Sequence, residues 1–410
     1  MRASPDLMSA LPARLPSRDS FHPAFIVPRY GEEVVGGAED LARRTAEELA
    51  SRGFEVSALA TRALDHHTWR DHYPPGTVEL NGVAVTRFDA KTRIAEPDMH
   101  RIASAIMRGD TINERDQRAW LSGVVTSDAL FEHIRREGGR YSHLIFLPYL
   151  FGTTFLGCAI RPDSSYVIPC LHDEPFAHLE LIRRMLASVK GLMFNSAGER
   201  RLAARLLCVD DPGPVVGMGF HALAGDARAF RDRAPVRGDF VLYAGRREEG
   251  KCTPLLVDYF RRFAVENPGR ASLVMMGAGE VTIPSDSSHI IFDVGRVSEQ
   301  QKWDGYAAAA VFCQPSVNES LSIVLLESWL TGAPALVRRD CAVTSEHVSS
   351  SGGGLAFRGY DEFASGLSMM LDKPELARRM GEAGRAYVER EYNWDSVLTR
   401  LFDALGVSDS

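Results

Sequence analysis

The chain has 410 residues, of which 45% are hydrophobic and 25% are charged, and its formal net charge at pH 7 is −7. A chain of this length is too long for one ordinary hydrophobic core, so two domains are predicted. The acidic balance disfavours general nucleic-acid binding, and no apolar run is long enough to span a membrane. The six cysteines include no Cys-x-x-Cys pair, which favours reduced thiols in a cytoplasmic protein.

The N-terminal half alternates strands and helices. Residues 1–20 carry Pro, Ser and Arg without a continuous apolar segment, so we expect a flexible tail and no signal peptide. Residues 64–139 are polar, and only a helix near residues 99–108 is predicted there. Apolar runs predict strands at 24–28, 54–60, 142–148, 165–169 and 191–196, with helices at 38–52, 149–159, 176–189 and 197–207.

The alternation resumes after a polar stretch at residues 225–238. Strands are predicted at 239–245, 271–277, 290–295, 310–314 and 334–337, with helices between them and a last amphipathic helix at 392–406. Such alternation predicts α/β architecture with parallel sheets covered on both faces. We therefore expect two doubly wound, Rossmann-like domains that face a cleft. They comprise residues 21–215 and 216–390, and residues 391–410 form a helix that packs back toward the first domain.

Ligands of doubly wound sheets bind beyond the carboxyl ends of the strands, so the residues that follow each strand are candidates. Arg246 and Lys251 follow strand 239–245 and can neutralise a diphosphate. A helix that starts near Ser322 points free N–H groups at an anion. Gly36 and Gly37, after the first strand, allow close approach of backbone to a ligand.

Two carboxylates mark the same region. Glu319 follows strand 310–314, and Glu327 lies eight residues later in an apolar helix, where an unpaired carboxylate is costly. A carboxylate can accept two hydroxyls of a ribose. Together with the basic residues and His172 after strand 165–169, this set predicts a site for a nucleotide diphosphate sugar.

The order Gly-Arg-x4-Lys, followed by Glu-x7-Glu at the start of an apolar helix, resembles the retaining GT-B glycosyltransferases of glycosyltransferase family 4 (glycosyl transferases group 1). The most specific match is PSVNESLSIVLLESWLTGAPALV, and the similarity extends from Phe21 to the C-terminal helix. The resemblance implies the GT-B fold, an acceptor-binding N-terminal domain and a nucleotide-sugar-binding C-terminal domain. It also implies sugar transfer with retention of configuration, without a covalent nucleophile, a metal or any other cofactor.

The resemblance implies roles for individual residues. His172 and Glu319 are expected at the donor sugar, Glu327 at the ribose, and Arg246 and Lys251 at the diphosphate. The remaining donor-binding candidates are Gly36, Gly37, Val297, Ser320, Leu321, Ser322 and Ile323.

This chain departs from the family pattern at two loops. Ser320-Leu321-Ser322 stands where the family has Gly-Phe-Gly, so two Cβ atoms lie where backbone alone approaches the sugar. Cys252 follows Lys251 where the family usually has glycine.

Other interpretations of these residues stay open. Arg246 and Lys251 could be solvated loop charges, Glu319 an exposed loop acid, and Glu327 a structural partner of an arginine. Gly36 and Gly37 could simply start a helix, and His172 could be an ordinary loop histidine. The adjacent acids after His172 (Asp173 and Glu174) suit capping as well as contact with the acceptor. A metal at the polar stretch of residues 65–72 has no supporting second-shell pattern.

The alternatives for the whole protein are a nucleotide-sugar epimerase, a sugar-phosphate synthase of the same fold and a non-catalytic binding subunit. The expected partners are a nucleotide-sugar donor and a glycan, lipid-linked or small-molecule acceptor of polysaccharide biosynthesis, and no nucleic acid. Arg183, Arg184 and Lys190 on one helical segment leave open a peripheral contact with the inner membrane face.

Overall fold

The computed structural model describes residues 20–234 and 236–407, and the chain forms two compact units. The first unit extends to Gly219 and includes the segment from Trp394, and the second unit is Phe220–Asn393. The predicted boundary between the two domains lay after residue 215, and the predicted C-terminal helix began at residue 391. The expected tail at residues 1–20 lies, except for Ser20, outside the described residues.

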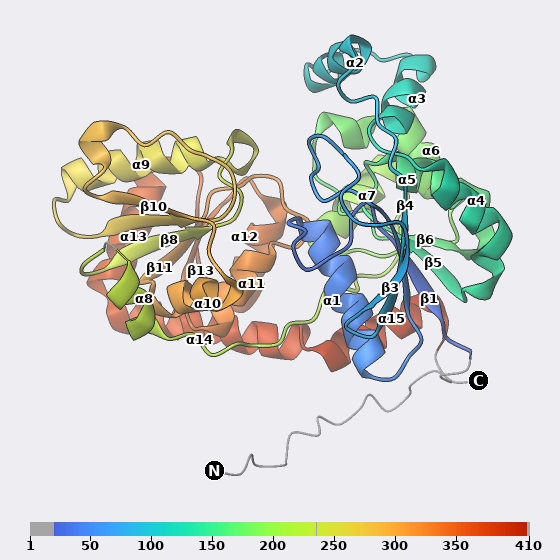
Figure 1. Ribbon diagram of the computed structural model, residues 1–410. Helices are drawn as coiled ribbons and strands as arrows, with labels where there is room; N and C mark the ends of the chain where they lie inside the picture. Colours follow the sequence, from blue (N-terminus) through green and yellow to red (C-terminus); the bar gives the residue numbers. More distant parts are fainter. Residues whose placement is uncertain (1–19, 235, 408–410) are drawn as a thin grey trace. The chain divides into compact units, whose positions relative to one another are not determined.

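The described residues of the first unit form a seven-stranded sheet with the order β3-β4-β2-β1-β5-β6-β7 (Figure 1). Neighbouring strands are parallel except β3 and β4. Its elements are β1 (Pro23–Ile26), α1 (Gly37–Ser51), β2 (Ser57–Thr61), β3 (Gly76–Leu80), β4 (Val83–Phe88), α2 (Pro97–Met107), α3 (Glu114–Gly123), α4 (Asp128–Glu137), η1 (Gly138–Arg140), β5 (His143–Phe146), α5 (Gly152–Gly157), η2 (Cys158–Ile160), η3 (Pro162–Ser164), β6 (Ser165–Val167), η4 (Pro175–His178), α6 (Glu180–Ser188), β7 (Gly191–Leu192), α7 (Ala197–Leu207) and α15 (Trp394–Leu405).

The central strands β1, β2 and β5 are buried along their whole length because both faces of the sheet are covered there. All four residues of β1 are buried, and Ile26 pairs with Leu59 on one side and Phe146 on the other. One face packs against the helices that follow β4, β5 and β6, and Phe402 of α15 contacts Phe21, which lies just before β1. This arrangement gathers the loops after β1, β2, β4, β5 and β6 at one edge of the sheet.

The polar stretch 64–139 contains three features beyond the predicted helix near residues 99–108, namely helices α3 and α4 and a β-hairpin. Strands β3 and β4 are joined by Asn81 and Gly82, both with positive φ (50° and 80°). Asn-Gly is the usual sequence of such a tight hairpin turn, so the signal was present. It was missed because β3 is an exposed edge strand with little apolar character.

The described residues of the second unit form a six-stranded parallel sheet with the order β10-β9-β8-β11-β12-β13 (Figure 1). Helices α9 and α13 pack together on one face, while α8, α10, α11 and α14 contact one another in a second helical layer. The elements are α8 (Ala227–Arg233), β8 (Phe240–Ala244), η5 (Glu249–Lys251), α9 (Thr253–Glu266), β9 (Ser272–Met276), η6 (Ser285–Ser287), β10 (Ile291–Gly295), α10 (Glu299–Ala308), β11 (Val311–Gln314), α11 (Ile323–Leu330), β12 (Ala335–Arg338), α12 (Ala342–Ser351), β13 (Gly354–Phe357), α13 (Tyr360–Asp372) and α14 (Pro374–Glu391).

These two sheets confirm the prediction of two doubly wound α/β domains. Strand β13 is an addition to the predicted set, and its two leading glycines, Gly353 and Gly354, suit close packing. A Cβ on Gly354 would lie 2.0 Å from the carbonyl oxygen of Ala335 in the neighbouring strand. Among the described helices, none combines the length and the apolar character needed to cross a membrane.

Candidate active site

In the second unit, one carboxylate joins three segments at the carboxyl edge of the sheet. Glu319 Oε1 accepts hydrogen bonds from Lys251 Nζ (2.9 Å) in η5 and from Gln314 Nε2 (2.8 Å) at the end of β11. Lys251 also donates to the carbonyl oxygen of Asn318 (3.3 Å). The two charged side chains are only 19% and 11% exposed, so the pair is stronger than a surface ion pair. The structure therefore brings together the predicted Lys251 and Glu319.

Helix α11 begins directly beside this carboxylate, after a strained residue. Ser322 precedes the helix with φ of 64°, in the left-handed region that non-glycine residues disfavour by about 1–2 kcal/mol. Its Oγ is buried and has no hydrogen-bond partner among the described residues. The first backbone N–H groups of α11, with Ile323 at its start, follow Ser322, and the binding of an anion by them stays a prediction. Ser320 is partly buried in the preceding loop and Leu321 is fully buried.

Both departures from the family pattern take the backbone conformation that glycine adopts without strain. Cys252, which follows Lys251, has φ of 56°, close to the value at Ser322. The loops around Lys251 and Glu319 thus keep a left-handed turn although neither residue is glycine. This conformation is retained at a cost in stability, which indicates that the loop geometry is needed.

A buried histidine, which was not among the predicted site residues, supports the loop. His347 in α12 is 2% exposed, and burial lowers its pKa to about 4, so the imidazole is neutral. Its Nε2–H donates to the carbonyl oxygen of Leu321 (3.0 Å), and its Nδ1 accepts from the Tyr387 hydroxyl (3.1 Å). His347 therefore holds the loop that carries Ser320 and Ser322. No sequence pattern links it to that loop, which lies 26 residues upstream.

Glu327 is buried in α11 and already has polar partners. Its side chain is 0% exposed, and Oε2 lies 2.9 Å from Lys302 Nζ and 3.2 Å from the donating hydroxyl of Tyr306, both on α10. The sequence offered an arginine as the structural alternative, and the partner found is a lysine. The role of Glu327 at a ribose stays a prediction, and Lys302 would have to share the carboxylate with the ligand.

The other two predicted residues of this unit are on loops at the same edge. Arg246 follows β8 and is about 40% exposed, with Nη1 3.3 Å from Glu248. Val297 is partly exposed between β10 and α10, and its contact with a base stays a prediction. The neighbouring Arg247 is buried, pairs with Asp293 and donates to the carbonyl oxygen of Gly279. Arg247 thus has a structural role, and Arg246 is the residue whose guanidinium reaches the surface.

In the first unit, a buried ion pair shapes the glycine loop after β1. Arg29 Nε donates to Glu39 Oε1 (2.9 Å), and both side chains are less than 10% exposed. A Cβ on Gly36 would lie 2.1 Å from Glu39 Oε2, so glycine is required there by packing. A Cβ on Gly37 would meet no atom within 4 Å. Packing against Glu39 therefore explains the glycine at position 36, whereas a side chain at position 37 would extend into open space at the start of α1.

His172 lies in the loop after β6, and a buried glutamate anchors that loop. Glu199 in α7 accepts hydrogen bonds from the backbone N–H of Leu171 (2.7 Å) and of Asn195 (2.6 Å), and burial raises its pKa to about 8. His172 Nδ1 lies 3.8 Å from Glu174, which accepts from the Tyr149 hydroxyl (2.9 Å). The motif Ser196-x-x-Glu199 resembles a capping box and could have revealed this anchor.

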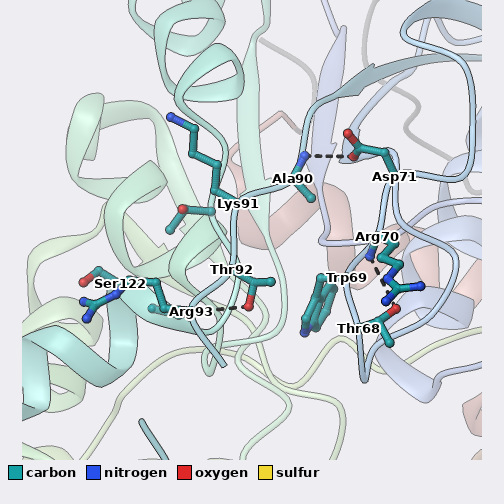
Figure 2. A pocket seen from close by; sticks show the side chains of 11 residues that line it. Thr68, Trp69, Arg70, Asp71, Ala90, Lys91, Thr92, Arg93 and Ser122 are labelled. Atoms are coloured by element: carbon teal, nitrogen blue, oxygen red, sulfur yellow. Dashed lines mark hydrogen bonds between the residues drawn. The ribbon is translucent and has the colours of Figure 1, made fainter. Parts of the chain in front are cut away.

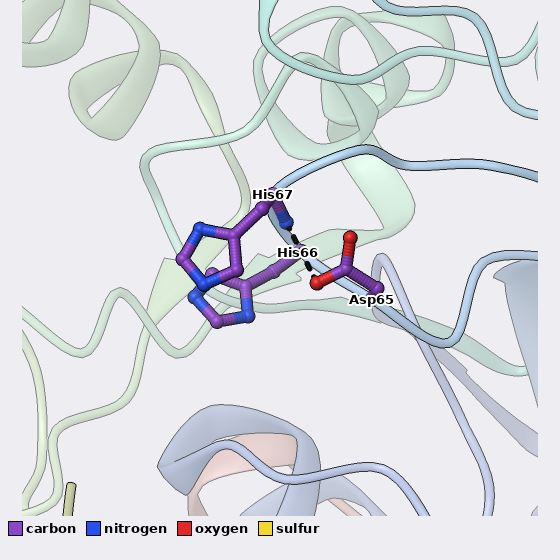
Figure 3. A group of neighbouring side chains, drawn as sticks. All are labelled: Asp65, His66 and His67. Carbon is purple, nitrogen blue, oxygen red and sulfur yellow. Dashed lines mark hydrogen bonds between the residues drawn. The ribbon is translucent and has the colours of Figure 1, made fainter. Parts of the chain in front are cut away.

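Asp65, His66 and His67 offer ligand atoms within 4.8 Å of one another (Figure 3). Asp65 accepts hydrogen bonds from the Thr68 hydroxyl (2.7 Å), the Thr68 N–H (2.7 Å) and the His67 N–H (3.2 Å). The hydroxyl hydrogen bond lowers the pKa of Asp65 to about 2. These contacts close a local turn. The Asp65 carboxylate is occupied by the hydrogen bonds that it accepts from Thr68 and His67.

Comparison with known proteins identifies the second unit. Residues 228–387 match the family model described as glycosyl transferases group 1. These residues form a glycosyl transferases group 1 domain. The predicted resemblance is thereby confirmed, and Arg246, Lys251, Glu319, Ser322 and Glu327 all lie inside the group 1 domain.

Similar proteins cover both units. The D-inositol 3-phosphate glycosyltransferase of Nocardia farcinica is 24% identical over 91% of this chain and 85% of its own length. The sucrose-phosphate synthase of Thermosynechococcus elongatus aligns with a TM-score of 0.69 and 18% identity, over 93% of this chain and 98% of the synthase. WaaG, a glycosyltransferase involved in lipopolysaccharide biosynthesis, aligns with a TM-score of 0.64 and 12% identity, over 94% of this chain and all of WaaG. These likenesses confirm the GT-B fold of this chain.

Proposed function

We propose that this protein is a retaining, metal-independent glycosyltransferase that moves a sugar from a nucleotide diphosphate sugar to a glycan, lipid-linked or small-molecule acceptor. The group 1 domain supports transfer from a nucleotide sugar. The observation that carries the proposal is the Lys251–Glu319 pair beside the N-terminus of α11. Cation, carboxylate and free backbone N–H groups at one point suit a ligand that carries both a diphosphate and sugar hydroxyls.

The proposed chemistry depends on stabilising the leaving diphosphate. Lys251 and Arg246 would neutralise its charge, and the N–H groups at the start of α11 would hold it as the glycosidic bond breaks. Glu319 would accept hydroxyls of the donor sugar. His172 is proposed at the reacting centre, where the Glu199-anchored loop fixes its backbone. In the retaining reaction, the leaving diphosphate would take the proton of the acceptor hydroxyl.

Turnover with a matched pair of lysine variants tests the proposal. The chain is incubated with UDP-, GDP-, ADP- or dTDP-glucose or -mannose and candidate acceptors in the presence of EDTA, and nucleotide release and the anomeric configuration of the product are followed by NMR. We expect nucleoside diphosphate and a product that retains the donor configuration. Lys251→Met should abolish turnover, while Lys373→Met, at an exposed residue of the same unit, should leave it unchanged.

The other outcomes identify the alternatives. An altered sugar still attached to the nucleotide would indicate an epimerase, and nucleotide-sugar binding without any product would indicate a binding subunit. A product with inverted configuration would refute the retaining mechanism. Activity that is lost with EDTA and restored by a divalent cation would refute metal independence.

We also propose a cytoplasmic location and a place in polysaccharide biosynthesis. None of the six cysteines, which all lie within the described residues, forms a disulfide, as a reducing compartment favours. Fractionation of the source cells tests the location, and recovery of the protein outside the cytoplasm and inner membrane would contradict it.

A further inference from the structure

The first unit has a pocket that none of the predicted site residues lines. It has a volume of about 600 Å³, within the usual range for small-molecule sites. Three segments form it: the loop after β2, the loop after β4, and the end of α3 with the turn that follows it (Figure 2). Four hydroxyl side chains line it, and they are Thr68, Thr92, Ser122 and Thr126.

Trp69 stands between the two sides of this pocket and has two unusual properties (Figure 2). Its φ is 53°, a left-handed conformation that a bulky residue rarely adopts. Its indole Nε1 is buried and has no hydrogen-bond partner in the part of the chain that the structure describes. An unpaired buried N–H is costly, and strain of this kind is concentrated at functional sites. A hydroxyl oxygen of a ligand seated against the indole would satisfy the N–H.

The charges around the pocket favour an uncharged ligand. Three of its four charged lining residues are already engaged in ion pairs, and only Arg70 has no ion pair among the described residues. The pairs are Lys91–Asp128, Arg93–Glu96 and Asp71–Arg62. An anion would have to compete with these carboxylates. Three of the four hydroxyls donate within the protein, Thr68 to Asp65, Thr92 to the carbonyl oxygen of Val124 and Ser122 to that of Arg118, so they offer a ligand acceptors. The indole N–H and the Arg70 guanidinium supply donors, and this combination matches the hydroxyls of a neutral sugar.

The pocket and His172 lie at the same edge of the sheet. The pocket loops follow β2 and β4, and His172 follows β6, which is three strands from β2 in the order β2-β1-β5-β6. Neighbouring strands are roughly 4.8 Å apart, so the two places are separated by on the order of 15 Å. A ligand that reaches from one to the other must be longer than a single sugar ring.

We propose that this pocket is a distal subsite for a neutral sugar unit of an oligosaccharide acceptor. The proposal rests on the proposed transferase function and selects the glycan among the three acceptor classes. The buried Trp69 donates its Nε1–H to one hydroxyl of the sugar, and the exposed Arg70 donates to a second hydroxyl.

Calorimetric titration of the full chain tests the subsite without the donor. The probes are two- to four-unit oligosaccharides of glucose, mannose, galactose and N-acetylglucosamine, with glucose 6-phosphate and inorganic phosphate as anionic probes. We expect one oligosaccharide series to bind, with Trp69→Phe weakening it about tenfold, the effect of one well-placed hydrogen bond. Arg70→Gln should weaken it severalfold, and the matched control Arg136→Gln, at an exposed arginine of α4, should not.

Every outcome decides the proposal. Binding of no oligosaccharide, or binding that neither Trp69→Phe nor Arg70→Gln affects, would overturn it. Preferential binding of glucose 6-phosphate, weakened by Arg70→Gln, would overturn the neutral-sugar assignment in favour of an anion site. UDP- and GDP-sugars are titrated into the same samples. Donor binding without oligosaccharide binding refutes the subsite and leaves the proposed function standing. Oligosaccharide binding without donor binding refutes the proposed function, and the pocket is then a sugar site without the acceptor role. Arg70 is exposed, so its variant remains informative should Trp69→Phe fail to fold.

Discussion

Replacement of Ser322 by glycine should stabilise the protein. The left-handed conformation at Ser322 costs about 1–2 kcal/mol for a non-glycine residue. Its buried Oγ, unpaired among the described residues, adds about 1 kcal/mol or more. Glycine removes both costs but loses about 0.5–1 kcal/mol through the greater entropy of the unfolded chain. The net gain in the free energy of unfolding is about 1–2 kcal/mol.

Thermal and urea unfolding of the ligand-free chain measures this gain. For a unit of this size, each kcal/mol should raise Tm by about 2–4 °C. The matched control is Ser320→Gly, two residues earlier, where φ is not positive and glycine should destabilise by about 0.5–1 kcal/mol. If Ser322→Gly is no more stable than Ser320→Gly, the strain at the start of α11 is absent and the reasoning fails.

Three further predictions concern buried polar groups. Lys302→Met should destabilise by about 2–4 kcal/mol in urea unfolding because it leaves Glu327 buried without its cation, and Lys302→Met combined with Glu327→Gln should recover most of the loss. Because burial lowers the pKa of His347 to about 4, the unfolded chain binds more protons below pH 6.5. Stability should fall by up to ~3 kcal/mol between pH 6.5 and 4, and His347→Gln should remove that part of the pH dependence. Glu199→Ala should lower the free energy of unfolding by roughly 2–4 kcal/mol and kcat at least severalfold, because the buried N–H groups of Leu171 and Asn195 lose their acceptor. Unchanged kinetics would show that this anchor is dispensable.

The fold was largely predictable because its signals are local. Apolar runs and helical periodicity predicted most strands and helices, and parallel topology followed from their alternation. The β3–β4 hairpin was missed because an exposed edge strand lacks the apolar signal, although Asn81-Gly82 marks its turn. Strand β13 is short and begins with glycine, so its strand character depends on pairing with β12.

The site was predictable only as far as strand ends determine position. Lys251 and Glu319 meet because their loops follow neighbouring strands, β8 and β11, at one edge of the sheet. The partner of Glu327 depends on how α10 packs against α11, which no local pattern specifies. The support that His347 gives to the loop at Leu321 likewise depends on tertiary packing.

Lys251 and the start of α11 are proposed to hold a nucleotide diphosphate. The most direct test is calorimetric titration of UDP-, GDP-, ADP- and dTDP-sugars, with EDTA present, into wild type, Lys251→Met and Lys373→Met. We predict that one base class binds without metal. Lys251→Met should weaken it at least tenfold, about 1.4 kcal/mol, while Lys373→Met leaves it unchanged. Binding that Lys251→Met does not alter, or the failure of all four classes to bind, would contradict the account.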